Sequence, residues 1–365
     1  MLKLKNKSLY IHIPFCEHIC SYCDFTKLFY NDKFSKLYLE ALFNELDSYK
    51  IGKMETIYIG GGTPTALNDE EFEKLLCKAS SYLDKNTEFT CEANVENLSS
   101  AKLTLMDKYG VTRLSIGVQS SHDERLKTLM RCHSFNDAVK VVNEAKKHNF
   151  SSINVDLIYG YPSQSKEELL EDLENILKLD TDHISIYSLS VSPGSIFYNN
   201  KVKEQNQDDS RDYYDLILST LRKHGYERYE ISNFARNKKY SRHNLTYWHD
   251  EPYYGVGLGA SGYVNGVRYT NTKSLDKYLK GEYVAEKEEV TPELDLEYYL
   301  LTNLRLEKGF SRQDFIDRFD FDFVAKYKDE VLSLEKKSQI IVSDDRIMLS
   351  DEGLMIMDSI LLKLI

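Results

Sequence analysis

The chain has 365 residues, of which 42% are hydrophobic and 29% charged, and its formal net charge is -11. This composition is typical of a globular protein, and the length allows more than one domain. The acidic balance disfavours nucleic-acid binding, which needs clustered lysine and arginine, and no apolar run of about 18 residues is present to span a membrane. The basic start, Met1 to Lys7, lacks the features of a signal peptide, so we expect a cytoplasmic protein.

Apolar runs and amphipathic stretches alternate through the first half of the chain. The predicted strands are Leu9–Ile13, Thr56–Ile59, Glu88–Cys91, Arg113–Val118, Ile153–Ile158 and His183–Leu189. The predicted helices are Phe34–Tyr49, Asp69–Leu83 with Asn68 as N-cap, Ser99–Tyr109, His122–Met130, Asn136–Asn149 and Lys166–Leu179. Six βα units indicate an α/β fold, a partial and open barrel with its site at the carboxyl ends of the strands.

The pattern changes after Asn200. A polar linker is predicted over Lys201–Arg211, a helix over Asp212–Lys223 and an irregular region to about Asn271. Beyond it, the predicted elements are helices Pro292–Leu306, Arg312–Arg318 and Val324–Lys336, a hairpin of Ile340–Val342 and Ile347–Leu349, and a final helix. We therefore expect a partial barrel over 1–225, an irregular connecting region over 226–290 and a C-terminal α+β winged-helix-like domain over 291–365.

Three of the six cysteines, Cys16, Cys20 and Cys23, have C-x3-C-x2-C spacing directly after the first predicted strand. Such clustering in a chain of this length indicates a metal site rather than disulfides. Zinc would take a fourth ligand from His12 or His18, whereas a [4Fe–4S] cluster can use three cysteines and leave one iron open. The scattered Cys77, Cys91 and Cys132 are predicted to be small buried hydrophobic residues.

The segment from Tyr10 to Phe25, YIHIPFCEHICSYCDF, resembles the radical S-adenosylmethionine (SAM) superfamily. Within it, the segment is most similar to the branch of oxygen-independent coproporphyrinogen III oxidases and their haem-chaperone relatives. The resemblance implies a [4Fe–4S] cluster on the three cysteines, with SAM chelating the open iron. Reduction of the cluster can then split SAM into methionine and a deoxyadenosyl radical. Tyr10 and Tyr22, beside the cysteines, are expected to contact the cofactors.

Further motifs follow later strands and resemble the same superfamily. Gly61, Gly62 and Thr63, in GGGTP, are expected to hold the methionine end of SAM, although a simple tight turn also fits these glycines. Asp156 lies in an apolar strand and needs a partner, either a ribose hydroxyl or an arginine in a structural salt bridge. By resemblance, the remaining SAM contacts are Glu92, Gln119, Arg131 and Ser188.

Two features distinguish the oxidases from the chaperones. The oxidases carry a fourth cysteine where this chain has Phe25, and a long extension where only nine residues precede Tyr10. His243, in the segment HNLTYW, matches a chaperone motif and is the candidate axial haem ligand, although a structural histidine beside aromatic residues is an equal alternative.

Two hypotheses therefore stay open. In the first, the protein is a haem carrier that delivers haem to acceptor proteins, with membrane-associated respiratory proteins among the possible partners. In the second, it is an active radical SAM enzyme acting on a tetrapyrrole or another small molecule.

Overall fold

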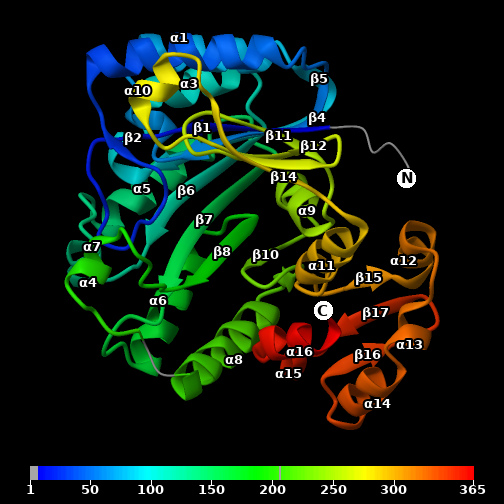
Figure 1. Ribbon diagram of the computed structural model, residues 1–365. Helices are drawn as coiled ribbons and strands as arrows, with labels where there is room; N and C mark the ends of the chain where they lie inside the picture. The colour runs from blue at the N-terminus through cyan, green and yellow to red at the C-terminus, as the bar shows by residue number, and fades with distance from the viewer. Residues whose placement is uncertain (1–6, 205–206) are drawn as a thin grey trace.

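The structure is a computed structural model that describes residues 7–204 and 207–365. Its main element is one mixed sheet of twelve strands with helices packed around it (Figure 1). The central strands run parallel, in the order β1 (Ser8–Ile13), β4 (Met54–Gly61), β5 (Leu83–Asn94), β6 (Arg113–Gln119), β7 (Ser152–Tyr159) and β8 (His183–Ser188). The sheet ends at β14 and β9 without closing, which confirms the predicted open barrel of six βα units.

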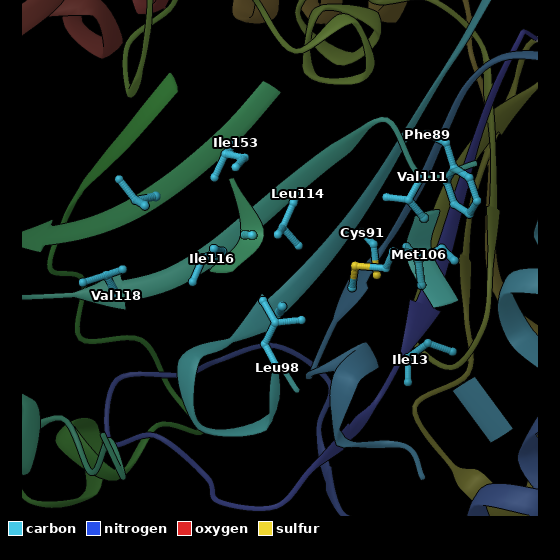
Figure 2. Close-up of a cluster of buried hydrophobic side chains, with 14 of the residues drawn as sticks. Ile13, Phe89, Cys91, Leu98, Met106, Val111, Leu114, Ile116, Val118 and Ile153 are labelled. Carbon is cyan, nitrogen blue, oxygen red and sulfur yellow. The ribbon is translucent and has the colours of Figure 1, made fainter. Parts of the chain in front are cut away.

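The central strands are apolar along most of their length because both faces of the parallel sheet are covered. Figure 2 shows the core between β5, β6 and the helices, where Cys91 lies among Phe89, Met106 and Leu114. Cys91 is fully buried, as predicted. The same prediction is wrong for Cys77 and Cys132, which are exposed; one lies on helix α2 (Asp69–Ser80) and the other in the loop after α4 (Asp123–Thr128).

Helix α2 begins where its predicted capping residue places it. Asn68 caps α2 by accepting a hydrogen bond from the backbone N–H of Glu71, as expected. The helix ends at Ser80, three residues earlier than predicted. The carbonyl of Tyr82 accepts a hydrogen bond from the backbone N–H of Met54, and strand β5 begins at the next residue, Leu83. The other helices of this half are α1 (Asp32–Ser48), α3 (Ser100–Lys108), α5 (Phe135–Ala145), α6 (Lys166–Lys178) and the short α7 (Ile196–Asn199).

Residues 226–290 are more ordered than the sequence predicts. They form β9 (Glu227–Arg228), β10 (Asn233–Ala235), α9 (Arg242–Trp248), β11 (Tyr253–Val256), β12 (Ser261–Val264), β13 (Val267–Asn271), α10 (Leu275–Leu279) and β14 (Val284–Glu289). Strand β11 pairs with β1 on one side of the parallel strands, and β10 pairs with β8 on the other. The strands are short, and Gly255 is required where β11 passes β12, since a Cβ there would lie 1.7 Å from the carbonyl oxygen of Ser261.

Helix α8 (Gln207–Lys223) also begins inside the predicted linker over Lys201–Arg211, of which residues 205 and 206 lie outside the described part of the chain. The basic segment Met1–Asn6 lies outside it as well. No helix in the described residues is both long and apolar enough to cross a membrane.

The C-terminal part has a hydrophobic core of its own. Its elements are α11 (Pro292–Asn303), β15 (Phe310–Ser311), α12 (Arg312–Phe319), α13 (Phe323–Lys326), α14 (Lys328–Lys336), β16 (Ile340–Val342), β17 (Arg346–Leu349), α15 (Asp351–Met355) and α16 (Met357–Leu364). The predicted hairpin is present as β16–β17, with β15 as a third strand. This part lies beside α8 and away from α1 (Figure 1), and ion pairs such as Arg318–Asp250 and Arg228–Asp351 tie it to the sheet domain.

A candidate cofactor site at the carboxyl ends of the parallel strands

A cavity of about 400 Å³ lies at the carboxyl ends of the parallel strands, and we call it the inner cavity. Its volume is within the range of pockets that hold small molecules and cofactors. The predicted site residues that line it are Cys16, Cys20, Tyr22, Cys23, Gly61, Gly62, Thr63, Glu92, Gln119, Arg131, Asp156 and Ser188. The fold thus gathers residues that are up to 172 positions apart in the sequence. Tyr10 and His243 are not part of the lining.

The cysteine loop follows β1 and includes the two-residue strands β2 (Phe15–Cys16) and β3 (Leu28–Phe29). The hydroxyl of Thr63 donates to Cys16 Sγ at 3.7 Å, and the guanidinium of Arg131 donates to Cys20 Sγ at 3.5 Å. Burial raises the pKa of Cys16 to about 12, so its thiolate needs a strong electropositive partner. Three cysteines around an open cavity, with donors to two of the sulfurs, fit a [4Fe–4S] cluster with one open iron.

The zinc alternative is less well supported. No group of three or more His, Cys, Asp or Glu side chains in residues 7–204 and 207–365 is arranged to hold a single metal ion. His12, one of the two candidate fourth ligands, uses its ring nitrogens in hydrogen bonds of 2.9 Å to the hydroxyl of Tyr10 and 2.8 Å to the carbonyl of Thr26. The hydroxyl of Tyr10 therefore faces His12 rather than the inner cavity.

The glycine turn after β4 lies directly against the cysteine loop. A Cβ on Gly61, which has φ +114°, would lie 2.4 Å from the ring of His12, and one on Gly62 would lie 2.8 Å from the backbone of Pro14. The N–H of Gly62 donates to Ile13 O at 2.8 Å. The glycines are therefore required both by the turn and by the close packing that brings the turn to the cysteines.

Two partly buried carboxyl groups face the inner cavity. Glu92 accepts hydrogen bonds from the Tyr58 hydroxyl at 2.6 Å and from Gly61 N at 3.0 Å, and burial raises its pKa to about 7. Burial also raises the pKa of Asp156, which accepts a bond of 2.7 Å from the side-chain amide of Asn154. Among the described residues Asp156 has no ion pair, so the structural salt bridge that its sequence context allowed is not formed. Both groups can accept from, or pair with, a cationic or hydroxylated ligand.

Several polar residues of the lining are not apparent from motifs. They occupy alternate positions on β6, β7 and β8, where the side chains of one face of the sheet point the same way: Arg113, Ser115, Asn154, His183 and Ser185. A period-two pattern of polar residues within otherwise apolar strands is the signal that identifies them. Arg113 donates to the Ser152 hydroxyl, and His183 bonds the side chain of Asn154 at 2.6 Å, so these groups form a connected floor.

Three buried polar atoms of the lining have no hydrogen-bond partner: Thr90 Oγ1, Arg131 Nε and Asn233 Oδ1. A buried polar group without a partner is costly, and a bound polar ligand is one way to satisfy it. The donor set, the carboxyl groups and these unsatisfied atoms therefore fit a polar, partly cationic ligand such as SAM beside the cysteines.

His243, the candidate axial haem ligand, does not line the inner cavity. Its side chain is fully buried, and its ring nitrogens make hydrogen bonds of 2.8 Å to Thr56 Oγ1 and 2.7 Å to the hydroxyl of Tyr247. Burial lowers its pKa to about 3. Both ring nitrogens are therefore engaged in hydrogen bonds in this structure, and the role of His243 as an axial haem ligand stays a prediction. Its neighbour Asn244 does line the inner cavity, because adjacent residues of α9 point in different directions.

The fold and this site define a radical SAM protein, and residues 10–176 match the family model of the Radical SAM superfamily. The chain is 36% identical to "Heme chaperone HemW" of Lactococcus lactis, over 96% of this chain and 94% of that one. It is 37% identical to the protein of the same name from Bacillus subtilis, over 95% and 96%. The chain belongs to the HemW family of the radical SAM superfamily.

The fold also matches a solved structure of coproporphyrinogen III oxidase (HemN) from Escherichia coli, with a TM-score of 0.86 and 21% identity over 99% of this chain and 90% of that one. At this identity the match concerns the fold alone. It supports the arrangement of the open barrel together with the strands and helices that follow it.

Proposed function

We propose that this protein is a haem chaperone that binds haem and transfers it to an acceptor protein, and that carries a [4Fe–4S] cluster and exchangeable SAM in the inner cavity. The observation that carries this proposal is its similarity, along almost the whole chain, to proteins named as haem chaperones. Membrane-associated respiratory proteins are one class of haem acceptor in this proposal. Transfer of haem from the purified protein to such an acceptor can be measured directly.

In this proposal Cys16, Cys20 and Cys23 hold the cluster as thiolates, with Thr63 and Arg131 donating to the sulfur ligands. A bound cluster with SAM supplies one-electron chemistry. Hydrogen bonds and charge near the sulfurs tune the potential of such clusters. The residues of this chain then bind and orient SAM, with the turn at Gly61 and Gly62 beside its methionine part.

The other lining groups complete the SAM site. Glu92 and Asp156 accept from cationic and hydroxyl groups, while Gln119 and Ser188 line the same cavity from the ends of β6 and β8. Arg131 contributes positive charge between the cysteine loop and these strands. Tyr10 does not line the inner cavity. Its hydroxyl bonds the ring of His12, and that ring packs against Gly61 of the glycine turn.

Phe25 favours the chaperone over the oxidase. In the resembling oxidases a fourth cysteine stands at this position, whereas here a phenylalanine side chain with 65% exposure lines the inner cavity. A phenyl ring has no exchangeable proton to transfer and cannot form a thiyl radical. Any chemistry that depends on a cysteine at this position is therefore lost. The complete set of SAM-motif residues keeps an active radical SAM enzyme as the second candidate function.

The test uses the anaerobically reconstituted protein. As a haem chaperone, it should bind haem, shown by a Soret band on titration, and should pass that haem to an apo-acceptor that is separated afterwards. It should not convert coproporphyrinogen III with SAM and a strong reductant. Turnover at an ordinary enzymatic rate, about 1 per second or more, or a failure to bind haem, would refute the proposal. Release of deoxyadenosine is measured in the same reaction to test the second candidate.

A further inference from the structure

Strand β11 runs into a glycine-rich turn, and we call the segment Gly255–Gly259, GVGLG, the brace segment. Its first two residues pair in parallel with Tyr10 and Ile11 of β1. The other three continue to the place where the chain leaves β1 for the cysteine loop. The brace segment is not part of the lining of the inner cavity, so the functions assigned to that cavity do not account for it.

The first contact of the brace segment is with His12, at the entrance of the cysteine loop. The hydroxyl of Tyr38 on α1 accepts a hydrogen bond from Leu258 N at 3.0 Å and donates one to His12 O at 2.6 Å. A Cβ on Gly257, which has φ +110°, would lie 2.6 Å from the same carbonyl oxygen. The ring of Tyr38 also packs edge-on against Phe15, directly before the first cysteine, with ring centroids 5.4 Å apart. One buried side chain thus links the brace segment to the residues that enter the loop.

The second contact is with Thr26, three residues after the last cysteine of the loop. A Cβ on Gly259, which has φ +72°, would lie 2.3 Å from Thr26 Oγ1 and 2.8 Å from Thr26 Cβ. A threonine side chain is stiff about χ1 and cannot turn freely away from an added methyl group. The carbonyl of Thr26 also accepts the 2.8 Å hydrogen bond from His12 Nε2, so the exit of the loop is tied to its entrance.

The brace segment is itself anchored by the buried Glu45 of α1. The carboxylate accepts hydrogen bonds from Gly257 N at 2.9 Å, from the side-chain amide of Asn271 at 2.6 Å and from the hydroxyl of Tyr278 at 2.5 Å. Helix α10, which carries Tyr278, lies beside α1 (Figure 1). Glu45 has no ion pair among the described residues, and a buried carboxyl group is costly unless hydrogen bonds satisfy it. Its three donors therefore fix the brace segment against α1.

The cysteine loop needs such support, because it has little regular structure. The strands that flank it, β2 and β3, have two residues each. A cubane cluster requires three thiolates in one fixed arrangement, and irregular segments open locally more easily than packed strands and helices. The contacts of the brace segment hold one residue on each side of the three cysteines, namely His12 and Thr26.

We propose that the brace segment, anchored by Glu45 and Tyr38, is a positioning element that holds both ends of the cysteine loop and thereby determines how firmly the cluster is retained. It acts through His12 and Thr26 rather than by contact with the cysteines. This inference rests on the proposed function for the cluster and specifies which distant part of the chain keeps that cluster in place.

The test compares Gly259→Ala with Gly266→Ala in the full chain after anaerobic reconstitution. Gly266 is the matched control, because it has φ +77° but no neighbouring atom within 4 Å of an added Cβ. Both changes carry a similar backbone strain, and only the change at Gly259 presses on the cysteine loop. The measurement is the rate at which a ferrous chelator removes iron, followed by the loss of cluster absorbance.

Gly259→Ala should release iron at least about 10-fold faster than the wild type, since a clash of this kind resembles overpacking of a core. Gly266→Ala should release it at close to the wild-type rate. Thr26→Gly removes all the side-chain atoms that the new methyl group meets. The double variant Gly259→Ala/Thr26→Gly should therefore release iron at the rate of Thr26→Gly alone, a reversal that a general loss of stability would not show.

Tyr38→Phe tests the entrance of the loop without adding a clash. It removes the hydroxyl that joins Leu258 N to His12 O, leaves both groups without that partner, and should speed iron release about 5-fold or more. The control is Tyr226→Phe, because the buried hydroxyl of Tyr226 also donates to a backbone carbonyl at 2.6 Å, that of Thr181, and lies two residues before β8. This control should keep the wild-type rate.

The same variants are compared without the cluster by hydrogen–deuterium exchange of residues 13–27. Exchange should be faster in Gly259→Ala and Tyr38→Phe and unchanged in the two controls. Equal iron release from Gly259→Ala and Gly266→Ala, or no reversal by Thr26→Gly, would overturn the role of the brace segment and leave the proposed function standing. If the wild type takes up no cluster, the proposed cofactor is wrong, and the exchange rates alone decide whether the brace segment holds the loop.

Discussion

Arg131 donates a hydrogen bond from its guanidinium to Cys20 Sγ at 3.5 Å, across 111 positions of the sequence. The same side chain bonds Gly117 O at 2.9 Å and pairs with Glu96 at 3.1 Å, so it joins the cysteine loop to the end of β6. Burial would disfavour its charge, but Tyr22, Glu96 and Cys20 hold the pKa of Arg131 above its usual value. A fixed positive charge therefore lies beside one ligand of the proposed cluster.

Changing Arg131 to Gln should make the cluster harder to reduce, because the positive charge beside Cys20 favours the added electron. We expect a potential about 60 mV more negative, which corresponds to about 1.4 kcal/mol for one electron. The measurement is a redox titration followed by electron paramagnetic resonance. Arg125→Gln is the matched control, since that arginine pairs with Glu168 outside the inner cavity. An unchanged potential in a variant with full iron content would contradict this role.

The cluster itself is tested by cysteine substitution. Cys16→Ala, Cys20→Ala and Cys23→Ala should each abolish the brown chromophore and the uptake of about four iron atoms per chain. Cys77→Ala and Cys132→Ala, at exposed cysteines outside the inner cavity, should keep both. Iron and sulfide are assayed after anaerobic reconstitution. Retention of iron by Cys16→Ala, together with loss in a Cys77/Cys132 double variant, would show that the site has been assigned to the wrong cysteines.

Glu92 should make SAM binding depend on pH. Burial raises its pKa to about 7, so the group is largely neutral at pH 6 and charged at pH 8, while the sulfonium of SAM stays cationic. Glu92→Gln should therefore weaken SAM binding about 10-fold at pH 8 and much less at pH 6. Equilibrium dialysis with labelled SAM on the reconstituted protein measures both values. Equal losses at the two pH values would show that the carboxylate charge is not involved.

His243 should behave as a structural residue. Its substitution by Gln leaves Thr56 or Tyr247 without a partner in the core and should cost about 1–3 kcal/mol of unfolding free energy, whereas haem binding and the Soret band should stay unchanged. His224→Gln, at an exposed histidine, is the control and should have little effect. A shifted Soret band in a folded His243→Gln variant would instead confirm His243 as the axial ligand predicted from the HNLTYW segment.

The same histidine predicts a pH dependence of stability. Its pKa is about 3 in the folded chain and near 6.5 when unfolded, so the unfolded state binds the proton first as the pH falls. The stabilisation from His243 is complete above about pH 6.5 and is lost towards pH 3, by up to about 1.4 kcal/mol per pH unit. Urea unfolding between pH 7.5 and 5 should show the difference between wild type and His243→Gln shrink at this rate. A constant difference would mean that His243 is protonated in the fold.

The sequence by itself determines the local parts of the site. The spacing of Cys16, Cys20 and Cys23, the glycine turn around Gly61 and the alternation of strands and helices can be predicted because each depends on residues close together in the chain. The common edge of the parallel strands follows as well, since the connecting helices return every strand in the same direction. Those rules were enough to place twelve of the fourteen predicted site residues in one cavity.

Only the tertiary structure decides the contacts between distant segments. Strand β11 joins the sheet beside β1 although their first residues, Ser8 and Tyr253, are 245 positions apart in the sequence. The few residues of β11 carry no periodicity of their own. The orientation of α9 turns Asn244 towards the inner cavity and His243 into the core. The motif HNLTYW alone does not predict which of these two side chains faces the cavity. A second cavity, which is lined by residues of the cysteine loop, by the end of α4 and by Lys273, likewise arises only where these segments meet. These features depend on how surfaces pack, and the energy of packing is shared among residues that no local pattern connects.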